Sequence, residues 1–163
     1  ILATNRPDSL DPAVTRDGRV DRKVYVGRPL PETATEIFKM NLKAAPMQDT
    51  HTVDSIAARG TELLFDPSRV LYVIRLKDGS KVTMTLGHVT NGAMIASICD
   101  QAIYNALQRD IDDGKKTATG VSALDFELVI DKVVRQNKSL NHEEDLEEFT
   151  RTFRSNVVDV TRV

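Results

Sequence analysis

The sequence has no tryptophan, only one cysteine and few aromatic residues, which make up 5% of its 163 residues. Because Cys99 has no second cysteine to pair with, an intrachain disulfide is excluded and the composition fits a reducing compartment. No apolar run approaches the roughly 20 residues of a membrane-spanning helix, so no membrane contact is expected. We therefore predict a cytoplasmic protein whose core is built mainly from aliphatic side chains.

An excess of positive charge is also absent. The chain carries 22 lysine and arginine residues against 24 aspartate and glutamate residues, which gives a net charge of -2. Dedicated nucleic-acid-binding domains are usually strongly basic, so nucleic acid is not an expected partner. One local basic cluster keeps a nucleic-acid-binding domain open as an alternative, namely Arg6, Arg16, Arg19, Arg22, Lys23 and Arg28.

The spacing of typical metal ligands is missing as well. His51, His88 and His142 stand far apart from one another and from Cys99, in a pattern that no zinc site uses. Cys99 falls on the apolar stripe of a predicted helix, where a buried cysteine is common. No metal site is therefore expected.

The order of the hydrophobic patterns predicts an α+β fold. Strand-like stretches precede a rigid Arg28-Pro29-Leu30-Pro31 boundary, and apolar residues recur at helical spacing beyond it. The predicted parts are residues 1–28, a helical unit at 29–140, and an acidic helix with a tail at 141–163. We predict strands at 1–5 and 23–27 and helices at 33–45, 52–65, 91–112, from Ser122 onward, and at 143–153.

A β-hairpin is predicted at residues 69–86, inside the helical unit. Its turn contains Asp78-Gly79, a pair that favours tight hairpin turns, and both flanks are rich in strand-forming residues. Alternation along the strands places Leu71, Val73, Val82 and Met84 on one face. We expect this face to pack on helices and the other face to contact water.

The opening stretch, LATNRPDSLDPAVTRDGRVDRKV, resembles the second region of homology of the AAA+ ATPases. Residues 31–43 resemble the first helix of the AAA+ lid, and Asn91-Gly92-Ala93-Met94-Ile95 resembles the start of a later lid helix. The resemblance covers residues 1 to about 140 and is closest to bacterial proteasome-associated ATPases and related ring unfoldases. It implies the remnant of an αβ core followed by a helical lid that carries the hairpin.

The resemblance assigns catalytic roles to three residues. Asn5 follows an apolar run and matches the sensor that orients the attacking water beside the γ-phosphate. Arg16 and Arg19 match the arginine fingers that a neighbouring subunit supplies, and arginine suits this role because its planar guanidinium fits phosphate oxygens. For Arg22 we prefer a structural ion pair with a nearby carboxylate.

Nucleotide contacts are implied for Asn41, Gly92 and Ala93. Asn41 matches a residue near the adenine or ribose, where many relatives have histidine. Gly92 and Ala93 match the pair at which a helix start packs closely on the nucleotide, and glycine suits such a close approach. The cofactors implied are ATP or ADP with magnesium in the full-length protein.

A phosphate-binding loop of the Gly-x-x-x-x-Gly-Lys-Ser/Thr type is missing from the sequence. We therefore expect no nucleotide to be bound to this segment alone and no ATP hydrolysis by it. A buried strand at residues 1–5 would need neighbours on both edges, so we expect a segment of a longer protein. We also expect residues 1–28 to be held by contact with another molecule.

The full-length function implied is ATP-driven unfolding or remodelling of proteins by a homohexameric ring. The expected partners are neighbouring subunits, protein substrates and a protease such as the proteasome. A non-enzymatic helical interaction module stays open as the main alternative, and a nucleic-acid-binding domain as a lesser one.

Overall fold

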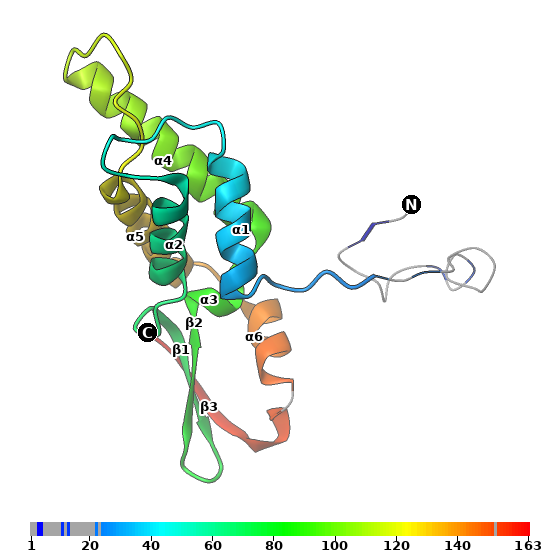
Figure 1. Cartoon of the computed structure of the whole chain (residues 1–163). Coiled ribbons are helices and arrows are strands. Elements are labelled where there is room, and N and C mark those ends of the chain that lie inside the picture. Colours follow the sequence, from blue (N-terminus) through cyan, green and yellow to red (C-terminus); the bar gives the residue numbers. More distant parts are fainter. Residues whose placement is uncertain (1–2, 5–10, 12, 14–21, 23, 152) are drawn as a thin grey trace.

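The structure is a computed structural model that describes residues 3–4, 11, 13, 22, 24–151 and 153–163 (Figure 1). Within them the chain forms six α-helices and a three-stranded antiparallel sheet, so the predicted α+β class is confirmed. The elements are α1 (Pro31–Leu42), α2 (Val53–Leu64), β1 (Val70–Leu76), β2 (Lys81–Thr85), α3 (Leu86–Val89), α4 (Gly92–Asp112), α5 (Ala123–Ser139), α6 (Glu143–Thr150) and β3 (Val157–Arg162).

Local capping explains where the long helices begin. The Thr52 hydroxyl accepts from the backbone N–H of Ser55, and the Ser55 hydroxyl accepts in return from the N–H of Thr52. Ser122 caps α5 with Asp125 in the same reciprocal way. Such capping boxes satisfy backbone donors that a helix N-terminus leaves free. The predicted helices are therefore confirmed, with ends that shift by a few residues.

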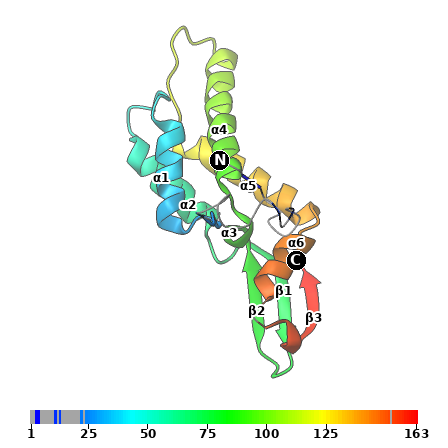
Figure 2. The ribbon, with the colours of Figure 1, turned by 90° about the vertical axis from the view of Figure 1, so that its right-hand side faces the viewer.

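Helices α1, α2, α4 and α5 pack into one cluster around an apolar core (Figures 1 and 2). The rings of Phe38 and Phe126 meet edge to face, with centroids 5.7 Å apart. Gly60 lies against both rings, because a Cβ at this position would be 3.2 Å from Phe38 and 3.3 Å from Phe126. The glycine inside α2 thus allows α2 to approach the two phenylalanines closely.

The predicted hairpin is confirmed and lies between the second helix and the later ones. Strands β1 and β2 pair antiparallel, and Gly79 takes a positive φ of 84° in the turn between them. The carboxylate of Asp78 accepts from the backbone N–H and the hydroxyl of Ser80, which fixes the turn. Figure 2 shows the strands side by side, extending away from the α3 end of the helices.

The prediction of which side chains share one face of the hairpin is wrong for strand β1. The register pairs Tyr72 with Met84 and Ile74 with Val82, whereas Val73 faces Thr83 on the opposite side of the sheet. An irregularity between Val70 and Tyr72 shifts the alternation by one residue. A bulge of this kind leaves an extra residue that breaks the period of two. Leu71 is nevertheless buried, as predicted.

The prediction that the last residues form a tail is also wrong, because residues 157–162 form strand β3. This strand pairs antiparallel with β1, so the order in the sheet is β2-β1-β3. Helix α6 precedes it and packs on α3, where the rings of Phe149 and His88 lie 4.6 Å apart. The acidic helix therefore docks on the helical unit, with Leu146, Phe149 and Phe153 packed against the core.

The strand predicted at 23–27 is not formed by the described residues 24–27. They have no regular secondary structure, and Val24, Tyr25 and Val26 are 71%, 82% and 87% exposed. Alternating residues are stable as a strand only when a neighbouring strand accepts their hydrogen bonds, and the described sheet lies elsewhere. The strand predicted at 1–5 and the intermolecular contact predicted for residues 1–28 concern residues that lie mostly outside the described ones.

Candidate functional site

The first turn of α4 carries two of the predicted nucleotide contacts, Gly92 and Ala93. Asn91 caps the helix, since its side-chain oxygen accepts from the N–H of Met94 at 2.8 Å. Apart from the adjacent residues and the backbone of α4 itself, no described atom lies within 4 Å of the point where a Cβ on Gly92 would sit, and Ala93 is exposed. A helix N-terminus of this kind favours anionic groups. The surface at Gly92 is therefore open, and the predicted close approach of a nucleotide stays a prediction.

The third predicted contact, Asn41, lies in the last turn of α1. Its side-chain amide donates to the carbonyl of Ile37 at 2.8 Å, and the residue is exposed. Helices α1 and α4 lie side by side with their N-termini at the same end (Figures 1 and 2). At a rise of 1.5 Å per residue, Asn41 lies about 15 Å along α1 from Pro31. The structure thus places Asn41 toward the opposite end from Gly92 and Ala93, and all three roles stay predictions.

The predicted catalytic residues Asn5, Arg16 and Arg19 lie outside the described residues. Their positions relative to the α4 N-terminus are therefore not part of the structure, and their roles also stay predictions. Residues 24–30, here called the linker, connect this stretch to α1.

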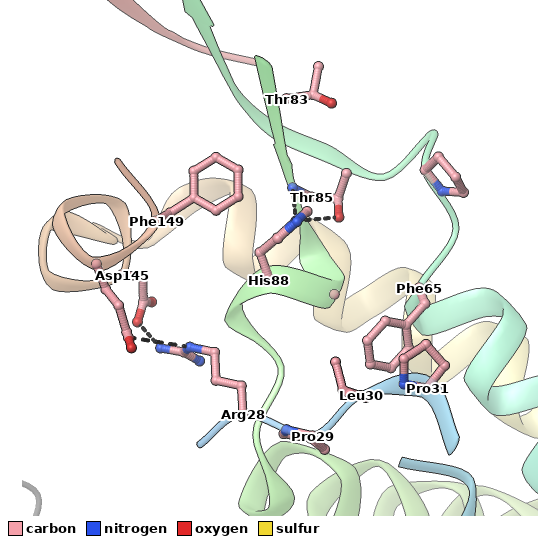
Figure 3. Close-up of a pocket in the computed structure, with 13 residues that line it drawn as sticks. Arg28, Pro29, Leu30, Pro31, Phe65, Thr83, Thr85, His88, Asp145 and Phe149 are labelled. Atoms are coloured by element: carbon pink, nitrogen blue, oxygen red, sulfur yellow. Dashed lines mark hydrogen bonds and ion pairs between the residues drawn. The ribbon is translucent and has the colours of Figure 1, made fainter. Parts of the chain in front are cut away.

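A pocket of about 550 Å³ opens where the linker meets the helical unit (Figure 3). It lies among the linker, the end of α2, strand β2, α3 and α6. Its apolar walls include Phe65, Phe149 and Leu30, and its polar groups include His88 and Asp145. None of the residues that line the pocket is one of the predicted nucleotide contacts Asn41, Gly92 and Ala93.

Arg28 is the residue that joins these parts and that the sequence patterns failed to identify. Its Nη1 donates to the carbonyl of Val89 at 2.7 Å, and its Nη2 pairs with the carboxylate of Asp145. Its Nε lies 3.8 Å from the carboxylate of Glu148, to which the Tyr25 hydroxyl also donates. No local sequence pattern indicated this pairing, because Arg28 and the acidic run at 143–148 lie far apart in the sequence.

The pairing of Arg28 weakens the nucleic-acid alternative. Its guanidinium already contacts two carboxylates and a carbonyl, so this charge is not free for a phosphate backbone. Arg22 is exposed, whereas Arg6, Arg16, Arg19 and Lys23 lie outside the described residues.

His88 acts as a structural anchor at the pocket wall. Its Nδ1 accepts from the backbone N–H of Thr85 at 3.0 Å, so this nitrogen must carry a lone pair. Burial lowers the pKa of His88 below its ordinary value, which agrees with a neutral ring. The Phe149 ring packs against it (Figure 3). A neutral His88 therefore holds α6 against α3.

The described residues contain neither a reactive cysteine nor a cluster of side chains that could hold a metal ion. Cys99 is fully buried, and burial raises the pKa of its thiol to about 12, so the reactive thiolate is suppressed. No cluster of histidine, cysteine, aspartate or glutamate in the described part is arranged to hold a metal ion. In the same part of the chain, no helix combines the length and apolarity required to cross a membrane.

The chain was compared with known proteins, and the relatives reported below share one description. No protein-family profile matches the chain. A protein of Corynebacterium efficiens described as "AAA ATPase forming ring-shaped complexes" is 35% identical over 152 residues. Relatives with the same description in Corynebacterium glutamicum and Bifidobacterium animalis are 31% and 32% identical over 91% and 89% of the chain.

The match spans most of this chain but a small part of each relative. It covers 93% of the chain and 28% of the Corynebacterium efficiens protein, and 27% and 29% of the other two. Over this shared part, the chain is a distant homologue of the ring-forming AAA ATPases.

Proposed function

We propose that this chain serves within an ATP-hydrolysing ring of identical subunits. It would supply the part of the module that senses the γ-phosphate, delivers arginines to the neighbouring subunit and closes over the nucleotide. The observation that carries the proposal is the similarity to ring-forming AAA ATPases along 93% of the chain. The order of Asn5, Arg16 and Arg19 in the opening stretch supports it.

Each proposed role follows from the charge that develops during phosphoryl transfer. Asn5 orients the water that attacks the γ-phosphate, and Arg16 and Arg19 neutralise the oxygens that gain negative charge. Gly92 and Ala93 let the N-terminus of α4 approach the nucleotide, with Asn41 on the base side. Magnesium and the phosphates themselves need a phosphate-binding loop, which this sequence does not contain.

In the assembled protein, the proposed ring is a homohexamer that uses ATP to unfold or remodel protein substrates. A protease such as the proteasome is the proposed downstream partner. The linker, which joins the residues proposed as fingers to the helical unit, would transmit the movement between them.

A chimera tests this proposal. The homologous segment of the Corynebacterium efficiens relative is replaced by this chain, and ATP hydrolysis is measured on purified rings. We expect the chimera to hydrolyse ATP, because the relative is described as an ATPase and the part of it that is kept would supply the phosphate-binding loop. Arg16→Ala or Arg19→Ala should lower the rate by about 10³-fold or more. Arg22→Ala is the matched control, with an expected change of only a few fold.

The contrary outcome favours a non-enzymatic interaction module. That outcome is a chimera that forms rings and binds ATP but does not hydrolyse it. A chimera that hydrolyses ATP at a rate unchanged by Arg16→Ala and Arg19→Ala would instead contradict the proposed roles of these two arginines.

A further inference from the structure

Strand β2 forms one free edge of the described sheet, since the strand order is β2-β1-β3. The N–H of Leu76 donates to the carbonyl of Ser80 across the hairpin turn, so these two residues are a hydrogen-bonded pair. Hydrogen-bonded and non-hydrogen-bonded pairs alternate along an antiparallel ladder. The register therefore makes Val73 and Thr83 a non-hydrogen-bonded pair. The backbone N–H and C=O of Thr83 thus point away from β1, toward the free edge.

The backbone of Thr85 agrees with this direction. Its N–H, two residues further along β2, donates outward to Nδ1 of His88 at 3.0 Å. At Thr83, which is exposed, the described part of the chain offers no corresponding partner to the backbone N–H or C=O. An edge with unpaired backbone groups can take up a further strand through main-chain hydrogen bonds.

The pocket of about 550 Å³ lies at this edge, because Thr83 is one of the residues that line it (Figure 3). Contacts with α3 hold its two half-buried aromatic rings in place. The ring of Phe149 packs on His88, with centroids 4.6 Å apart. A Cβ at Gly87 would lie 2.8 Å from the ring of Phe65, so this ring packs directly on the backbone of α3. Preformed apolar walls of this kind suit a bulky aliphatic or aromatic group.

The polar groups of the pocket suit a peptide backbone and a cation. Because Nδ1 of His88 accepts from Thr85, the neutral ring carries its proton on Nε2, and no described group accepts from that nitrogen. Asp145 and Glu148 line the pocket with Arg28, which is the only lysine or arginine among the described lining residues. Two carboxylates against one guanidinium leave a net negative charge, which favours a basic side chain on the ligand.

We propose that the β2 edge and this pocket bind an extended peptide segment of a partner protein. The segment adds a fourth strand beside β2, with main-chain hydrogen bonds to Thr83, and a carbonyl of the segment accepts from Nε2 of His88. A bulky apolar side chain packs on the walls at Phe65 and Phe149, and a lysine or arginine of the segment meets Glu148. Main-chain contacts supply affinity and the pocket supplies sequence preference. The inference does not depend on the proposed ATPase role.

Fluorescence anisotropy with labelled probe peptides tests the proposal on the whole chain. The probes are Lys-Val-Phe-Val-Lys and Lys-Val-Leu-Val-Lys, which combine strand-forming residues, one bulky apolar side chain and basic ends. We expect saturable binding that alanine at the central position weakens by about 30-fold. Glutamate in place of both lysines should also weaken it. Failure of both probes to bind at about 1 mM, or equal binding of the alanine peptide, would overturn the proposal.

Thr83→Pro tests whether the probe pairs with the strand edge. Because the N–H of Thr83 points away from β1, proline removes it without breaking the hairpin ladder, and a sheet edge tolerates proline at such a position. Probe binding should be lost in Thr83→Pro and should stay within a few fold of the wild type in the matched control Thr83→Ala, which keeps the N–H. Unchanged binding by Thr83→Pro would contradict strand addition.

Two further measurements keep the result decisive. If Thr83→Pro does not fold, two probes methylated at alternate backbone nitrogens replace it, and one of them must lose binding because its N–H groups face β2. In nuclear magnetic resonance spectra, the amide proton of Thr83 should exchange more slowly once the probe is added. Self-association of the chain that Thr83→Pro abolishes, without probe binding, would instead assign the edge to a second copy. Probe binding that leaves the exchange of Thr83 unchanged would assign the pocket to a ligand without strand pairing, and both results contradict the proposal.

Discussion

Gly120 shows how one residue can fix the path of a loop. It has a positive φ of 89°, and a Cβ there would lie 2.4 Å from the backbone carbon of Met47. The chain is pinned at this point by two backbone hydrogen bonds, from Gln48 to Val121 and from Val121 to Pro46. The loop after α4 thus lies directly on the segment after α1, and only glycine fits between them.

Gly120→Ala should therefore lower the free energy of unfolding by about 2–5 kcal/mol, from the strained backbone and the overlap together. Gly79→Ala is the matched control, because Gly79 also has a positive φ but nothing lies within 4 Å of its Cβ position. Strain alone should cost the control about 1–2 kcal/mol. Urea denaturation measures both, and equal losses would show that the contact with Met47 does not matter.

Asp110 makes the stability of the same loop depend on pH. Its carboxylate accepts from the hydroxyl and the backbone N–H of Thr119 and also faces Lys115. These hydrogen bonds lower the pKa of Asp110 to about 2. A depressed folded-state pKa contributes stability that is complete above the ordinary value and is lost as the pH falls toward about 2.

Asp110→Asn should consequently be less stable than the wild type at pH 5 and should lose less stability than the wild type between pH 5 and pH 2. Asp100→Asn, at an exposed position on the same helix, is the control and should leave the wild-type profile unchanged. Thermal unfolding across the pH series gives the comparison. If Asp110→Asn and the wild type show parallel profiles, the hydrogen bonds to Thr119 do not hold the carboxylate ionised.

At the scale of the elements, predictions succeeded where the signal is local. Thr52, Asn91 and Ser122 cap the helices that follow them, and Asp78-Gly79 makes the hairpin turn within four residues. These signals act over one helical turn or one β-turn, so the sequence alone contains them.

The failures concern contacts between distant residues. Strand β3 pairs with β1, where Val160 faces Ile74, and its own residues are mostly exposed and carry little hydrophobic pattern. Arg28 pairs with Asp145, which lies 117 positions away in the sequence. The bulge at Leu71 depends on how β1 pairs with β2. Of the candidate site, the start of α4 at Gly92 could be predicted from its motif, whereas the contacts of Arg28 with α3 and α6 could not.

The role of β3 can be tested by ending the chain after Asn156. If β3 is a true strand, its removal exposes one edge of β1 and should cost on the order of 2–4 kcal/mol, at about 1 kcal/mol for each hydrogen bond lost. The control changes Val158 and Thr161 to alanine, which removes exposed side chains but keeps the backbone ladder. It should cost less than about 1 kcal/mol. A truncated chain as stable as the full one would show that residues 157–163 are only a tail.

At the scale of the whole molecule, the linker connects the two parts of the chain for which different roles are proposed. Upstream of it lie the residues proposed to act on the γ-phosphate, and downstream lies the helical unit with its open α4 N-terminus. Arg28 fastens the linker to α3 and α6. In the proposed ring, we expect a change in the nucleotide to be transmitted through the linker to the helical unit.

The central claim is that Arg16 and Arg19 act on ATP held by a neighbouring subunit. It is tested most directly by mixing two inactive chimeras with each other. Both are built from this chain and the Corynebacterium efficiens relative, as in the chimera described above. One carries Arg19→Ala in this chain, and the other carries a substitution of the lysine in the relative's phosphate-binding loop. Mixed rings contain interfaces in which an intact arginine meets an intact loop, so we predict that ATP hydrolysis returns on mixing. Rings that assemble from both variants and remain as inactive as either variant alone would contradict the account.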